Sequence, residues 1–297
     1  ARCGSVRAAA SASAITACTP AANPRAQMRP VHRPPREPAD RLPHCEWTVT
    51  IDPEADPLPF PVQAERLLPS KAAALPLATP HPRLPTDDGW GDYAGPFDPD
   101  LVMERFASAT LAAILDEVAL QGHLLARGFL LPVVDRIGGD DTVTIGAKQV
   151  TGIAGLTARR LAATLDAPAG LDGVAAVLAV HPLFLPRSYV ALALDPSTDA
   201  DAGDGPLLVS LLDCPALEED DGLTWPGILA TGHDRAISAI VQEVDPHARA
   251  ERIDPVAGAA ATWSVTHDAT REAAPSLDEV TITDFSTGAG FAFTRRT

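Results

Sequence analysis

The feature that most constrains this fold is a short segment that occurs twice. Residues 46–52 read EWTVTID, and residues 262–268 read TWSVTHD. The first segment is rich in β-branched residues and alternates apolar with polar ones, a pattern typical of a strand with Trp47, Val49 and Ile51 on one face. We therefore expect the same kind of strand, each with a buried tryptophan anchor, near the start and near the end of the chain.

Two further matches precede the strands in the same order along the chain. The sequence NPRAQ at 23–27 matches DPHAR at 245–249, and AITA at 14–17 matches AISA at 236–239. Three matched pieces in one order indicate a duplicated unit. The chain opens in the middle of this unit, so we expect a fragment or an incomplete first copy.

A linker separates the two expected copies. Residues 76–99 contain six prolines and three glycines, which is typical of an extended connection. We predict a partial first copy at 1–75 (helix, strand, strand, helix) and a complete second copy at 100–297. Helices gather at the start of the second copy and strands at its end, so the predicted class is α+β, with helices packed on an antiparallel sheet.

The longest predicted helix begins at Ser108, a plausible N-cap residue. We expect Pro132 to kink or end it and Gly138 and Gly139 to stop it. A second helix is predicted over 155–165. The apolar stripe that should pack the long helix on the core comprises Leu111, Ile114, Leu115, Val118, Leu125 and Phe129.

The remaining elements are predicted mainly from β-branched and apolar runs. Towards the start we expect a helix over 5–18, a strand over 25–32 and a helix over 60–75 that Pro69 breaks. Later come strands at 187–195 and 207–212, a helix at 235–243, a strand pair around Ala250 and Trp263, and strands at 280–285 and 290–294.

The charge distribution argues against some partners. The net charge is −16, with 10 Lys/Arg and 7 Asp/Glu in residues 1–85, so the remainder is strongly acidic. Such a surface repels nucleic acids and anionic lipids. No apolar run in the sequence approaches the roughly 18 residues of a membrane span. We therefore expect neither a nucleic acid nor a membrane as partner, and a small molecule as ligand.

The four cysteines form no CxxC pair. This pattern argues against a zinc ribbon or a thioredoxin-like motif, and we assign no metal site. A disulfide framework is not expected in a chain this long, so we expect reduced thiols in the cytoplasm. The alternative is a lipoprotein anchored at Cys18, since arginines and an Ala/Ser run precede it. No nucleotide-binding or metalloprotease motif occurs, so no cofactor is expected.

Two resemblances carry further expectations. The segments NPRAQMRPVHRPPR (23–36), PHCEWTVT (43–50) and ALQGHLLAR (119–127) resemble a family of uncharacterised actinobacterial proteins. More distantly, Cys45 before an aromatic strand and the Asp213-Cys214-Pro215 segment resemble L-2-amino-thiazoline-4-carboxylic acid hydrolase-like domains. That likeness implies cysteine chemistry, although Ala261 stands where the second copy would repeat Cys45.

Cys214 and His233 form the candidate catalytic pair. Cys214 closes an apolar strand beside Asp213, and His233 precedes a predicted helix. A thiol near a helix N-terminus has a lowered pKa and could act as a nucleophile with a histidine base. The alternative is a buried thiol and a surface histidine.

Four further residues are candidates for ligand binding: Asp116, Arg127, His44 and Cys45. His123 joins the catalytic candidates, because it shares a helix side with Asp116 and Arg127. This side is either a solvated face or the lining of a cleft. His44 and Cys45 point to opposite sides of a strand and cannot readily pair, so Cys45 is either a core or a reactive thiol.

Two functions remain open from the sequence. One is a ligand-binding or structural α+β protein, favoured by the absence of a recognisable catalytic motif. The alternative is a small-molecule hydrolase-like enzyme that uses Cys214 and His233, with His123 nearby.

Overall fold

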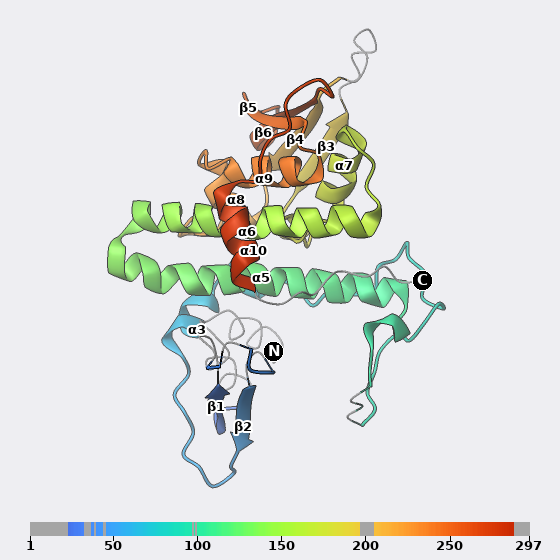
Figure 1. Cartoon of the computed structure of the whole chain (residues 1–297). Coiled ribbons are helices and arrows are strands. Elements are labelled where there is room, and N and C mark those ends of the chain that lie inside the picture. Colours follow the sequence, from blue (N-terminus) through green and yellow to red (C-terminus); the bar gives the residue numbers. More distant parts are fainter. Residues whose placement is uncertain are drawn as a thin grey trace. The chain divides into compact units, whose positions relative to one another are not determined.

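A computed structural model describes residues 23–32, 37–38, 40–43, 46–96, 98, 100–196 and 205–287 (Figure 1). Within these residues the chain forms eight α-helices and two antiparallel sheets, which confirms the α+β class. The predicted helix at 5–18, the predicted strand at 290–294 and the candidate residues Cys18, His44 and Cys45 lie outside the described part.

The chain divides into two compact units. The first consists of Ala1–Pro76 and Gln121–Arg136, and the second of Leu77–Leu120 and Ile137–Thr297. The sequence prediction assigned 121–136 to the second copy, whereas the compact unit groups these residues with the start of the chain.

The first unit contains a two-stranded antiparallel sheet. Strand β1 (Ala26–His32) pairs with β2 (Glu46–Ile51), with Ala26 opposite Ile51 and Pro30 opposite Trp47. Two short helices follow, α3 (Val62–Leu67) and α4 (Lys71–Ala74). They are separate because Pro69 interrupts the predicted helix, and Ser70 accepts a hydrogen bond from the Ala73 N–H as N-cap of the second.

The second unit contains a four-stranded antiparallel sheet in the order β3-β4-β6-β5. Its strands are β3 (Leu192–Pro196), β4 (Leu207–Leu212), β5 (Ala248–Ile253) and β6 (Ala259–His267). Strand β4 has the predicted bounds, and the predicted pair around Ala250 and Trp263 is confirmed. Trp263 is fully buried and anchors the sheet to the core.

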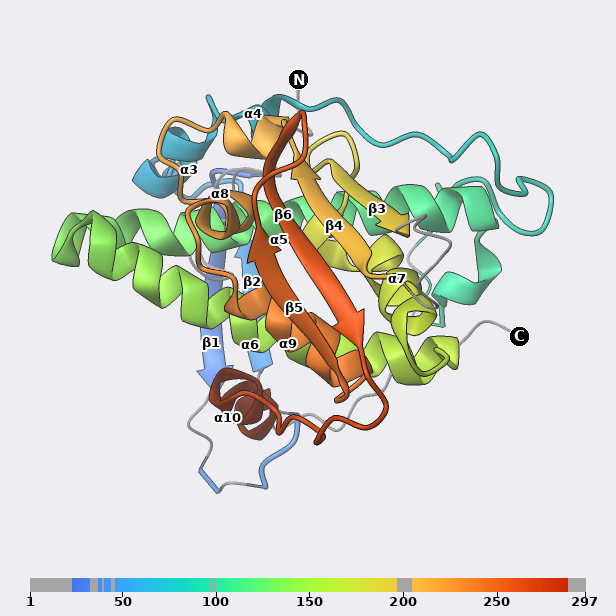
Figure 2. The same ribbon diagram turned by 90° about the horizontal axis from the view of Figure 1, so that it is seen from above.

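Helices cover one face of this sheet. Figure 1 shows α9 (Arg235–Val244) between the sheet and α6 (Gly139–Leu165), and Figure 2 shows α7 (Leu171–Val180) beside them. Helix α9 confirms the prediction to within one residue, because its apolar stripe follows helical spacing and is buried. The other elements of this unit are α8 (Trp225–Ala230) and the 3-10 turns Met103–Arg105, Pro182–Phe184 and Pro215–Leu217.

The predicted strand at 280–285 is wrong, because these residues belong to helix α10 (Asp278–Thr287). The β-branched residues favoured a strand locally. Two acidic residues in the first turn, Asp278 and Glu279, favour a helix N-terminus. Val280 is buried on α6, where Gly152 and Gly155 leave room for the helix to approach closely. Tertiary packing therefore overrides the local preference.

Helix α5 (Ser108–Ile137) begins at the predicted residue but has a different inward face. The expected core residues Leu115, Val118, Leu125 and Phe129 are exposed. The helix also continues past Pro132 and ends at Ile137, before Gly138 with its φ of 88°. By length and composition alone α5 could cross a membrane, but core helices pass the same test.

Two other boundaries differ from the predictions. Helix α6 begins at Gly139 rather than near Gly155, since its Thr- and Gly-rich first half has little apolar periodicity. Strand β3 begins at Leu192 rather than Arg187. The intervening residues turn because the N–H groups of Tyr189 and Val190 both donate to the carbonyl of Pro186.

The predicted linker is not a free connection: its described residues are hydrogen-bonded to the start of α5. Asp88 accepts hydrogen bonds from the N–H and the hydroxyl of Ser108 and thereby caps α5. Trp90 forms a parallel bridge with Phe106 and stacks on Tyr93, with ring centroids 5.6 Å apart. Prolines prevent regular structure here, but the segment is tied to the start of α5.

Candidate functional site

The candidate pair Cys214 and His233 lies in the second unit. Cys214 follows β4 and precedes the 3-10 turn Pro215–Leu217, and its side chain is buried, with 5% of the residue exposed. His233 lies in the turn before α9 and is half-buried. The structure shows no hydrogen bond or ion pair between these two residues. Asp213 is exposed while its neighbour Cys214 is buried, and the grouping of Asp213, Cys214 and His233 stays a prediction.

The three candidates on α5 do not share one compact unit. His123 and Arg127 belong to the first unit and Asp116 to the second. His123 and Arg127 are buried, with 2% and 4% of the residue exposed, so the expectation of a solvated face is wrong for them. They lie one helical turn apart, where side chains share a face.

Asp116 lies in a small charged group within the second unit. Burial raises the pKa of Asp116, while the charges of His81 and Arg187 oppose this rise. Burial also lowers the pKa of Arg187, which donates a hydrogen bond to the carbonyl of Ala179 at 2.9 Å. The group is an electrostatic pairing of α5 with the segment after α7.

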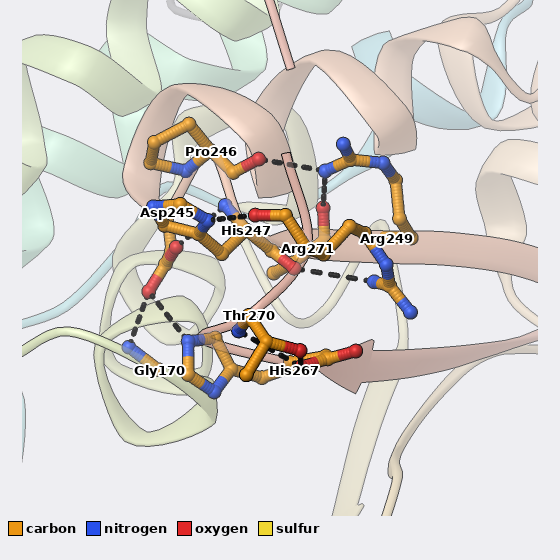
Figure 3. Close-up of polar contacts among 10 residues, drawn as sticks. Gly170, Asp245, Pro246, His247, Arg249, His267, Thr270 and Arg271 are labelled. Atoms are coloured by element: carbon orange, nitrogen blue, oxygen red, sulfur yellow. Dashed lines mark hydrogen bonds and ion pairs between the residues drawn. The ribbon is translucent and has the colours of Figure 1, made fainter. Parts of the chain in front are cut away.

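A cluster of polar side chains surrounds Asp245 (Figure 3). Asp245 directly follows α9, Gly170 precedes α7, and His267 ends β6. The Oδ2 atom of Asp245 accepts a hydrogen bond from the Gly170 N–H at 2.6 Å and lies 3.4 Å from His267 Nε2. Its Oδ1 atom accepts from the N–H of His247 at 2.8 Å. One buried carboxylate thus connects the ends of three elements.

The environment of Asp245 favours its charged form. Burial alone would raise the pKa of this carboxyl, but hydrogen bonds from the His247 and Gly170 N–H groups lower it. The charges of His267 and His247 act in the same direction. The pKa of Asp245 is consequently below its usual value.

The side chains around Asp245 are engaged mainly with backbone atoms. His247 Nδ1 donates to the carbonyl of Arg271 at 2.6 Å, and Arg271 donates to the carbonyl of His247 at 3.2 Å. Arg249 donates to the carbonyls of Pro246, Ala248 and Glu272. These bonds fix the path of the chain after β6 against the start of β5.

This arrangement can hold backbone segments together. The ion pair between Asp245 and His267 depends on pH, because it requires a protonated histidine. No group of three or more His, Cys, Asp or Glu side chains suited to a metal ion occurs in the described part of the chain. The sequence prediction missed Asp245 and His267 as members of one site. Both lie inside the repeated segments DPHAR (245–249) and TWSVTHD (262–268). Their place in the internal repeat is the sequence signal that could have identified them.

Comparison with protein-family models, with curated proteins and with solved structures finds no match to this chain. The resemblances to the actinobacterial family and to the hydrolase-like domains therefore stay predictions.

Proposed function

We propose that this chain is a ligand-binding or structural α+β protein whose polar residues mainly organise its backbone. The observation that carries this proposal is the engagement of the Asp245 cluster. Its carboxylate accepts two main-chain N–H groups besides pairing with His267 at 3.4 Å, and His247 and both arginines donate to main-chain carbonyls. A catalytic constellation instead requires a nucleophile and a base within hydrogen-bond reach.

We further infer that the chain is built from two copies of one module. The module consists of a hairpin followed by a loop and a helix: β1, β2 and α3 in one unit, and β5, β6 and α10 in the other. Ala26 lies opposite Ile51 and Ala248 opposite His267, which are matched positions in the repeated segments. Helices α3 and α10 both begin 15 residues after the matched tryptophan.

The alternative is a small-molecule hydrolase-like enzyme with Cys214 as nucleophile. This function needs an accessible thiol with a lowered pKa. The burial of Cys214 and the lack of a hydrogen bond or ion pair between Cys214 and His233 argue against it. The weak hydrolase-like resemblance around Asp213-Cys214-Pro215 is what favours it.

Thiol reactivity distinguishes the two functions. A chain in which Cys3, Cys18 and Cys45 are replaced by serine leaves Cys214 as the single thiol. We expect this thiol to react with a disulfide reagent at pH 7 about tenfold or more slowly than free cysteine, and at the normal rate after unfolding. Reaction faster than free cysteine, with a midpoint below the usual thiol pKa and dependent on His233, would favour the enzyme.

A further inference from the structure

We propose that the outer edge of β2 receives a third, antiparallel strand from a partner protein. The partner segment would carry apolar side chains at alternate positions and basic residues at its N-terminal end. This inference deepens the proposed binding role by naming a surface and a partner chemistry, and it does not depend on Cys214.

The first step is the equivalence of β2 and β6. Both hairpins begin with the same turn: the Arg25 N–H donates to Asn23 Oδ1 at 2.9 Å, and the His247 N–H donates to Asp245 Oδ1 at 2.8 Å. Each turn also accepts a hydrogen bond from the loop that follows its hairpin. The Leu58 N–H donates to the carbonyl of Pro24, and the Ala274 N–H donates to the carbonyl of Pro246.

The loops after the two strands also match. The Glu54 N–H donates to Asp52 Oδ1 at 2.9 Å, and the Thr270 N–H donates to Asp268 Oδ1 at 2.9 Å. These residues are 216 positions apart, as are Trp47 and Trp263. The backbone around β2 is thus built like the backbone around β6.

The second step is the difference in what covers the two strands. The edge of β6 away from β5 pairs with β4, which places Leu207 opposite Val265 and Val209 opposite Trp263. On β2 the edge away from β1 pairs with no strand among the described residues. Val265 is fully buried, whereas its counterpart Val49 is 50% exposed.

The third step is the lack of protection on this edge. Proteins usually block open strand edges with proline, basic residues or bulges. Strand β1 has Pro30 and an irregular register after it, and β5 has charged residues such as Arg249 and Arg252. Strand β2 contains no proline, glycine, lysine or arginine. A two-stranded hairpin alone is also marginally stable, which favours addition of a strand.

The charges beside β2 indicate the direction in which the partner strand runs. Exposed acidic residues Asp52, Glu54 and Asp56 follow β2. A strand that pairs with β2 as β4 pairs with β6 begins beside the C-terminal end of β2. Basic residues at the partner's N-terminal end would therefore lie near these three carboxylates, which would attract them. Main-chain hydrogen bonds supply affinity in this mode, and alternate side chains supply specificity.

The test uses the full chain and a fluorescent peptide, KKLLVSLL, which is two lysines followed by the β4 sequence. We expect saturable binding by fluorescence anisotropy, lost when alternate peptide nitrogens on the pairing edge are methylated. The variant Val49→Lys should weaken binding about tenfold, while Val31→Lys should change it less than about twofold. Val31 is a matched control because it is 52% exposed and lies on β1.

Three outcomes would overturn the proposal: no saturable binding, equal binding of the methylated peptide, or equal weakening by Val31→Lys. Circular dichroism confirms that both variants keep their fold, which is expected because both valines are half-exposed. A peptide with its lysines at the C-terminal end should bind more weakly, and equal binding would overturn the assigned direction. Failure of peptide binding with an unreactive Cys214 leaves the proposed non-catalytic role standing.

Discussion

The carboxylate of Asp245 lies 3.4 Å from Nε2 of His267 and also accepts the N–H of Gly170, so one side chain joins the end of β6 to the start of α7. The matched position in the first hairpin is Asn23, and the counterpart of His267 is Ile51. The charged pair is therefore specific to the second hairpin.

Replacing this carboxylate should destabilise the second unit. We expect Asp245→Asn to lower the free energy of unfolding by about 1–3 kcal/mol at pH 7, because a buried acceptor of two backbone N–H groups loses its charge. Urea unfolding measures the change. The control Asp172→Asn removes the same charge from an exposed position in the first turn of α7 and should change stability by less than about 0.5 kcal/mol.

The pH dependence of this effect follows from the lowered pKa of Asp245. A carboxyl with a lower pKa in the folded state stabilises the protein above its unfolded pKa, and this contribution is lost as the pH falls through the folded value. The difference between wild type and Asp245→Asn should therefore shrink below about pH 4. An undiminished difference at pH 3 would contradict this assignment.

His181 should make stability sensitive to mild acid. It is buried between α6 and the turn Pro182–Phe184: Nδ1 accepts from the Leu183 N–H, and Nε2 donates to the carbonyl of Ala154. Burial lowers its pKa to about 4, although the bond to Ala154 opposes this shift. The unfolded chain then binds a proton that the folded chain does not bind, so stability falls as the pH decreases from about 6.5 to about 4.

This loss is at most about 3.4 kcal/mol, because stability falls by about 1.4 kcal/mol for each pH unit between the unfolded and the folded pKa. Urea unfolding between pH 7 and pH 4.5 measures it, and His181→Gln should flatten the slope in this range. Equal slopes in wild type and His181→Gln would contradict the prediction.

Gly152 should be required for the contact between α6 and α10. A Cβ atom at this position would lie 2.6 Å from the backbone oxygen of Glu279 and against the hydroxyl of Thr283. We expect Gly152→Ala to cost about 1–3 kcal/mol in thermal or urea unfolding, because the two helices must separate. Gly122 in α5 has no atom near the equivalent position, so Gly122→Ala should be neutral or stabilising by up to about 1 kcal/mol.

Arg159 should hold α10 in place. It donates to Glu243 at the end of α9 at 2.7 Å and to Asp284 on α10 at 3.0 Å. The pKa of Arg159 is raised, chiefly by the hydrogen bond to Glu243. We expect Arg159→Gln to speed amide exchange in α10, because the free energy of opening this helix falls by about 0.5–1 kcal/mol. The control Arg83→Gln, at an exposed position, should leave the exchange unchanged. Unchanged exchange in α10 would show that its other contacts, such as the ion pair of Arg235 with Glu279, hold the helix without Arg159.

The sequence predicted those elements whose local pattern agrees with their packing. Strand β4 and helix α9 have near-continuous or strongly amphipathic apolar patterns, so both were found almost to the residue. Helix α10 was predicted as a strand because its β-branched residues become helical only through packing on Gly152 and Gly155. Such a contact between distant residues leaves no periodic signal in either segment.

The inward face of α5 could not be read from its sequence for a similar reason. The prediction placed the leucine-rich stripe on the core and the side with His123 and Arg127 either in solvent or along a cleft. The structure buries both polar residues and exposes Leu125 and Phe129. Hydrophobic periodicity identifies a helix, but it selects the buried face only when one side is clearly more apolar than the other.

The candidate site was predictable only in part. The internal repeat identified the segments that contain Asp245 and His267, because three matched pieces occur in the same order in both copies. It could not show that Gly170, far from both in sequence, donates to the same carboxylate. Residue type and position at a strand end and before a helix selected Cys214 and His233, and no hydrogen bond or ion pair in the described structure joins them.

The matched hairpins differ in length although their strands pair alike. Trp47 is 21 positions after Ala26, whereas Trp263 is only 15 positions after Ala248. The turn before each hairpin and the paired strands, rather than the connection between them, thus determine the register. The β5–β6 connection is consequently a suitable place to splice in a reporter peptide, since extra length in such a loop adds only about 0.6 kcal/mol for each doubling.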